Sequence, residues 1–115
     1  MSKITDIWFR CGLDLKALGS QFGLSDIESD SENYWGWVTG YLDGYHLDIT
    51  RPHQVSPTKT DTRLFLLGEK QEFSQTLIIY IVEKLKGIGV ERIYLGKWVS
   101  RGGQDFVKKV VKSIQ

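Results

Sequence analysis

Hydrophobic and polar residues alternate along several stretches of this chain, which is the pattern of half-buried strands. Two such runs cover residues 34–42 and 45–51, and a third covers residues 4–10. Shorter apolar runs at residues 63–67 and 91–99 predict two more strands, the first of them fully buried. The pattern therefore predicts a protein with a substantial β-sheet.

The dipeptide Asp43-Gly44 lies between two of these alternating runs. A two-residue type I′ turn needs positive φ at both central positions, and Asp-Gly is one of the pairs that tolerate it. Residues 34–42 and 45–51 are therefore predicted to form a β-hairpin. Its first arm has glycines at positions 36 and 40 on one face, where another segment can approach closely.

A helical period replaces the alternation in three places. Residues 14–21 predict a short helix with Asp14 as N-cap or first-turn acid and Gly23 as a left-handed C-terminal residue. Residues 69–86 predict a second helix that ends at Gly87, and the alternative is a strand, since the centre of this segment is β-prone. Its apolar stripe comprises Phe73, Leu77, Ile78, Ile81, Val82 and Leu85.

Residues 102–115 are predicted to form a third helix at the end of the chain. Its lysines at positions 108, 109 and 112 are then expected to face water. Its apolar stripe comprises Phe106, Val107, Val110, Val111 and Ile114.

These elements predict one α+β domain over residues 1–115, with a mainly antiparallel sheet and two to three helices. The expected order is β-α-β-β-β-β-α-β-α. The helices are expected to pack on one face of the sheet, and the strands at residues 4–10 and 91–99 to be central or adjacent.

An acidic segment precedes the hairpin, with a carboxylate at every second position. In an extended conformation these side chains project from one face. The segment is then either a protected edge strand or solvated loop, or an anionic ladder that meets a basic surface. The four residues are Asp26, Glu28, Asp30 and Glu32.

Aromatic residues are abundant, with four Trp and five Tyr, and several fall on opposite faces of the same predicted strand. They cannot all enter one core. Trp and Tyr are favoured anchors of protein interfaces, and adjacent acids add steering toward a basic partner. The alternative for each individual Trp is packing beneath a helix.

The distribution of charge is uneven although the net charge is only +1. Residues 1–48 contain three basic and eight acidic residues, net −5, and residues 49–115 are net +6. Either the two halves mix in space, or the asymmetry steers a charged partner. The pI near 7.8 and the pairing of aromatics with acids argue against a nucleic-acid partner.

The single cysteine, Cys11, cannot form an internal disulfide, which favours a reducing compartment. The first ten residues lack a signal-peptide pattern, and the longest apolar run, residues 77–82, is too short to span a bilayer. We therefore expect a soluble cytoplasmic protein that makes no membrane contact.

His46, Asp48 and His53 form the one cluster with acid–base or metal-ligating character. Three such residues at these spacings match no common ligand pattern. A small enzyme or a metal- or ligand-binding domain that uses this cluster is the alternative function. We expect no cofactor and no catalytic residue.

The chain resembles small bacterial immunity proteins of contact-dependent growth-inhibition systems. The resemblance covers most of the chain and rests on the strings IWFRCGLDLKALGSQFGL, WGWVTGYLDGYHLDITRPH, TRLFLLGE and YLGKWVSRGGQDF. It implies a non-enzymatic cytoplasmic protein that binds a cognate toxin domain and covers its active site.

Many toxins of these systems are nucleases, whose phosphate-binding clefts are basic. The resemblance thus implies a basic protein partner, which an acidic strand with aromatic anchors can occlude. We expect the free protein to be a monomer. The residues expected to contact the partner are Asp26, Glu28, Asp30, Glu32, Trp35, Trp37, Tyr41, Asp43, His46 and Asp48.

Overall fold

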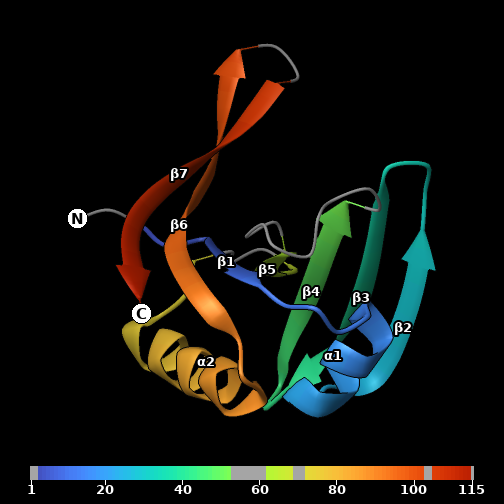
Figure 1. Ribbon diagram of the computed structural model, residues 1–115. Helices are drawn as coiled ribbons and strands as arrows, with labels where there is room; N and C mark the ends of the chain where they lie inside the picture. Colours follow the sequence, from blue (N-terminus) through green and yellow to red (C-terminus); the bar gives the residue numbers. More distant parts are fainter. Residues whose placement is uncertain (1–2, 53–61, 69–71, 103–104, 115) are drawn as a thin grey trace.

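The alternating runs form one antiparallel sheet in the computed structural model, which describes residues 3–52, 62–68, 72–102 and 105–114 (Figure 1). Within these ranges the sheet has seven strands in the order β2-β3-β4-β5-β1-β6-β7. The strands are β1 (Asp6–Arg10), β2 (Ser25–Ser31), β3 (Trp35–Leu42), β4 (Tyr45–Pro52), β5 (Thr62–Leu66), β6 (Glu91–Gly102) and β7 (Asp105–Ile114).

The first strand lies in the middle of this sheet. β1 pairs with β5 on one side and with β6 on the other, both antiparallel. The expected adjacency of the strands at residues 4–10 and 91–99 is therefore confirmed. Together with two helices, the sheet gives the predicted α+β class in the described part of the chain.

Helix α1 (Leu15–Phe22) begins and ends where the sequence predicts. The Asp14 side chain accepts a hydrogen bond from the Ala17 N–H at 2.9 Å, which satisfies one of the free N–H groups of the first turn. Gly23 ends the helix with a left-handed φ of 93°. Both capping predictions are confirmed.

Helix α2 (Gln75–Ile88) starts and ends later than predicted. Its N-cap is Ser74, whose hydroxyl accepts from the Leu77 N–H at 3.1 Å, and the preceding Phe73 N–H donates to the Ile4 carbonyl at 2.8 Å. Gly87 lies inside the helix, and Gly89, at φ 91°, ends it. The six residues of the predicted apolar stripe are all buried.

The predicted helix at residues 102–115 is wrong, because Gly102 ends β6 and residues 105–114 form β7. An irregularity in the β6–β7 ladder, which pairs Leu95 with Lys112 and Gly96 with Val110, leaves Val111 as an extra residue of β7. β-Branched valines also favour strands over helices. Long pairing with β6 therefore overrides the helical spacing.

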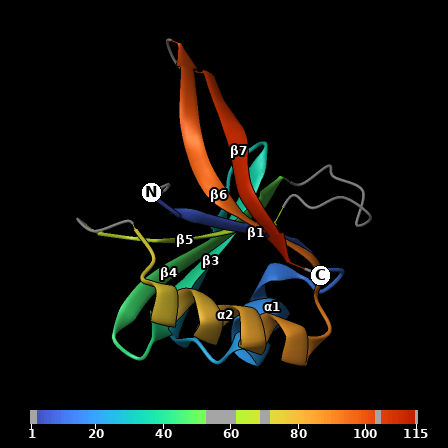
Figure 2. The same cartoon turned by 90° about the vertical axis from the view of Figure 1, so that its left-hand side faces the viewer.

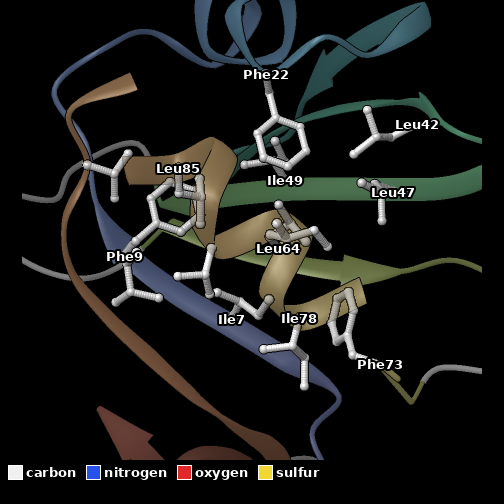
Figure 3. Close-up of a cluster of buried hydrophobic side chains, with 14 of the residues drawn as sticks. Ile7, Phe9, Phe22, Leu42, Leu47, Ile49, Leu64, Phe73, Ile78 and Leu85 are labelled. Carbon is white, nitrogen blue, oxygen red and sulfur yellow. The ribbon is translucent and has the colours of Figure 1, made fainter. Parts of the chain in front are cut away.

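Both helices cover the same face of the sheet, and the β6–β7 hairpin projects away from them (Figures 1 and 2). One apolar core lies between the helices and the sheet (Figure 3). Its fully buried large side chains include Ile7, Phe9, Phe22, Leu47, Ile49, Leu64 and Leu85.

The β3–β4 hairpin has the predicted turn, since Asp43 and Gly44 have φ values of 49° and 85°. The predicted close approach to the glycine-bearing face of β3 is also present. A Cβ on Gly40 would lie 2.7 Å from the Leu24 Cβ and 2.9 Å from the Ser25 carbonyl oxygen. The segment that leaves α1 therefore crosses directly over β3.

Candidate functional site

The sheet face opposite the helices gathers most of the predicted contact residues from β2, β3 and β4. Directly opposed residues in an antiparallel sheet share a face. Trp37 is opposed by Asp30 on one side and Thr50 on the other, and Thr39 by Glu28 and Asp48. We call this surface the acidic–aromatic face; it comprises Glu28, Asp30, Trp35, Trp37, Tyr41 and His46.

Aromatic side chains of this region are unusually exposed. Trp35 retains 41% and Tyr41 42% of its accessible surface, and Tyr34 and Tyr45, at the ends of the hairpin arms, retain 76% and 44%. Trp37 is half-buried. Trp and Tyr have an apolar body and a polar atom, and they are enriched in protein interfaces.

Tyr41 and His46 form a stacked cross-strand pair. Their ring centroids are 4.4 Å apart and the rings are inclined by 7°. The two residues are directly opposed in the β3–β4 ladder. This stacking holds both rings in place at the end of the face that lies next to the hairpin turn.

The acidic segment is an edge strand, as one of the two interpretations expected, but it presents fewer carboxylates on one face. A register irregularity lies between Ser25 and Glu28, and Asp26 there has a positive φ of 51°. Glu32 lies beyond the end of β2, where its N–H donates to the Trp35 carbonyl at 2.8 Å. That hydrogen bond continues the register in which Asp30 opposes Trp37, so Glu28, Asp30 and Glu32 keep the expected alternation, and the irregularity at Asp26 makes the predicted four-carboxylate ladder wrong.

Asp43 lies apart from the acidic–aromatic face. It occupies the hairpin turn, where its carboxylate accepts a hydrogen bond from the hydroxyl of Tyr80 in α2. That hydrogen bond raises the pKa of Tyr80 above its ordinary value. Asp43 is thereby directed toward the helices.

Asp48 shares the face but is 9% exposed. Its carboxylate accepts a hydrogen bond from the Thr50 hydroxyl. Burial raises the pKa of Asp48, against the opposing effects of the Thr50 hydrogen bond and the charges of Arg63 and His46. Asp48 therefore lies among the buried residues beneath the acidic–aromatic face, which we call its floor.

A buried ion pair, which the sequence pattern did not indicate, continues this floor onto β1 and β5. Asp6 is 1% exposed and accepts a hydrogen bond from the Thr5 hydroxyl at 2.6 Å. Arg63 Nε pairs with the Asp6 carboxylate, and its guanidinium lies 4.0 Å from the centroid of the Phe65 ring. The one available signal was a charged residue inside a β-prone run.

Arg51 ties the end of β4 to the segment between β1 and α1. Its guanidinium donates to the Leu13 carbonyl at 2.6 Å, to the Thr62 hydroxyl at 3.0 Å and to the Cys11 carbonyl at 3.3 Å. Burial lowers the pKa of Arg51. Cys11 is a free, half-buried thiol, in keeping with a structural position.

The cluster of the alternative function is only partly described. His46 and Asp48 lie on the same sheet face, whereas His53 lies outside the described residues. Over the described ranges, no group of three or more His, Cys, Asp or Glu side chains is placed to hold a metal ion. Neither described helix is long and apolar enough to cross a membrane.

Comparison of the chain with protein-family models, with curated proteins and with solved structures finds no match in any of the three.

Proposed function

We propose that this protein is a cytoplasmic, non-enzymatic immunity protein that binds a basic bacterial toxin domain through the acidic–aromatic face. The observation that carries the proposal is the exposure of Trp35 and Tyr41 beside Glu28 and Asp30, on a sheet face that neither helix covers. The resemblance of the chain to immunity proteins supports the same function.

The aromatic and the acidic residues of this face have different roles in binding. Trp35 and Tyr41 offer large apolar surface together with a polar atom, which suits them as anchors in a protein interface. Glu28 and Asp30 lie on the edge strand next to the anchors, where they can pair with lysine or arginine of a partner. A nuclease cleft carries such cations because it binds phosphate.

The mechanism is occlusion of the toxin's active site. Carboxylates at the phosphate positions exclude the nucleic acid, and the aromatic residues slow dissociation. Long-range attraction between the acidic face and the basic cleft accelerates association, and salt weakens that attraction. No chemical step on the immunity protein is required.

The test is binding to the product of the adjacent gene, purified as an inactive variant and measured by calorimetry. We expect a one-to-one complex, and we expect Glu28→Lys combined with Asp30→Lys to weaken it by about 2–5 kcal/mol, the range for disrupted interfacial charge pairs. The same double variant should fail to protect cells that express the active toxin.

Glu72→Lys combined with Glu83→Lys is the matched control, because both glutamates are exposed and lie on the helix side of the molecule. It makes the same change in net charge and should retain wild-type affinity. Unchanged circular dichroism is required of both variants. Wild-type affinity in the Glu28/Asp30 variant, or equal loss in the control, would refute the proposed interface.

A further inference from the structure

A pocket of about 500 Å³ lies far from the acidic–aromatic face in the strand order, where α2 ends and β6 begins. Figure 2 shows the C-terminal ends of α2 and β7 on the same side of the molecule. This volume is in the range of small-molecule sites. Its lining residues are Lys86, Val90, Arg92, Ile93, Tyr94, Ser113 and Ile114.

The backbone at this pocket contains a β-bulge. Trp8 of β1 is opposed by Tyr94 and Arg10 by Glu91, so β6 has one residue more than β1 over this span. Arg92, within the bulge, adopts a positive φ of 58°. A non-glycine residue in this conformation costs about 1–3 kcal/mol, and such strain and bulges concentrate at functional sites, where they redirect a side chain.

Two of the residues that line the pocket carry a positive charge. These are Lys86 and Arg92, and neither has a carboxylate partner among the described residues. The described lining contains no acidic side chain, so the pocket favours an anion.

The remaining lining is apolar. Ile114 of β7 is half-buried, whereas Val90 and Ile93 beside it belong to the core and keep only 8% and 2% of their accessible surface. An inorganic anion alone would leave the Ile114 side chain in contact with water. An anion with an apolar body would cover it and still reach the two cations.

We propose that this pocket binds a small organic anion, in which one carboxylate or phosphate group meets Lys86 and Arg92 and an apolar body covers the half-buried Ile114. The site is independent of the proposed toxin interface, since it shares no residue with it. Ligand binding at this pocket can therefore be tested independently of the immunity function.

The experiment titrates the isotopically labelled full-length protein with octanoate, below its micelle threshold, and follows amide signals by NMR. We expect shifts to concentrate at Lys86, Arg92, Tyr94 and Ser113. Lys86→Gln combined with Arg92→Gly should weaken octanoate binding by about tenfold or more, because two charge-assisted contacts are lost. Glycine suits position 92 because it tolerates the positive φ.

Lys3→Gln combined with Lys16→Gln, at two exposed positions, removes the same amount of charge and is the control, which should bind octanoate normally. Uncharged octanol tests the apolar part of the ligand alone, and inorganic phosphate tests the anionic part alone. Both should bind more weakly than octanoate. Equal binding of octanol or of phosphate would overturn the proposal. Shifts located elsewhere, or unchanged binding in the Lys86/Arg92 variant while circular dichroism is unchanged, would also overturn it.

Discussion

At the scale of single residues, Gly40 shows how closely the chain is packed where β3 meets the segment after α1. No side chain fits there without movement, because both near neighbours, the Leu24 Cβ and the Ser25 carbonyl, are close to or part of the backbone. The sequence indicated this approach through the glycines on one face of the predicted arm. The residue that makes the contact was visible only in the structure.

Gly40→Ala should therefore destabilise the protein by about 1–3 kcal/mol, the usual effect of overpacking. The free energy of unfolding from urea titration measures it. Gly12→Ala is the control, because a Cβ at Gly12 meets no atom within 4 Å, and it should change stability by no more than about 0.5 kcal/mol. Equal effects of the two substitutions would contradict the close approach.

The burial of Asp48 makes the stability of the protein depend on pH. Its folded-state pKa is raised, so between the ordinary value of about 3.9 and that raised value the folded state binds more protons than the unfolded state. The contribution of Asp48 to the free energy of unfolding is greatest below about pH 3.9, and it is lost as the pH rises through the raised pKa. Ionised Asp48 thus opposes folding at neutral pH.

Asp48→Asn should remove this loss, so that unfolding free energies measured from pH 4 upward decline less steeply than in the wild type. The Asn side-chain oxygen can still accept from Thr50. Thr39→Ser, at a position directly opposed to Asp48 and without a titratable group, is the control and should leave the slope unchanged. Parallel curves for wild type and Asp48→Asn would contradict the raised pKa.

At the scale of elements, the end of α2 distinguishes two glycines that the sequence alone did not separate. Gly87 lies within the helix, is exposed, and has open space around its would-be Cβ. Gly89 has the left-handed φ that ends the helix, and its N–H donates to the Lys86 carbonyl at 3.0 Å. Substitutions at the two positions should therefore have opposite effects.

Gly87→Ala should stabilise the protein by about 0.5–1 kcal/mol, because alanine is the better helix former. Gly89→Ala should destabilise it by about 1–3 kcal/mol, because a Cβ is strained at that φ. Thermal unfolding followed by circular dichroism compares the two. Destabilisation by Gly87→Ala together with a neutral Gly89→Ala would place the helix end where the sequence pattern first suggested.

The sequence predicted elements well wherever local chemistry decides the structure. Asp14 and Gly23 fixed both ends of α1, and Asp43-Gly44 fixed the hairpin turn. The helix prediction failed at β7, where apolar residues at helical spacing lie on a strand that pairs with β6 and carries an extra residue at Val111. Long-range register is not encoded in a local period.

The same limit applies to the candidate site. Alternation correctly grouped Trp35, Trp37 and Tyr41 on one face, but the register irregularity beside Asp26 removed that carboxylate from the series. The pairing of Asp6 with Arg63 joins residues far apart in sequence, and the charged residue inside a β-prone run did not identify its partner. Local patterns thus identified the surface but not its floor.

At the scale of the whole molecule, the charge asymmetry of the sequence persists in space. β2, with Glu28 and Asp30, is one edge of the sheet, and β7, with Lys112, is the other. The two halves of the chain therefore do not mix completely. Opposite edges present opposite charge, which suits the acidic–aromatic face to a basic protein and the distant pocket to an anion.

The central place of β1 also determines when the protein can fold during synthesis. The first strand to leave the ribosome has both of its hydrogen-bonding neighbours, β5 and β6, far downstream in the sequence. The β2–β4 meander can form from local contacts, but β1 must wait until residues 62–66 and the start of β6 have emerged. The nascent chain therefore exposes an unpaired apolar strand for most of its translation, and completion of the sheet is a late event.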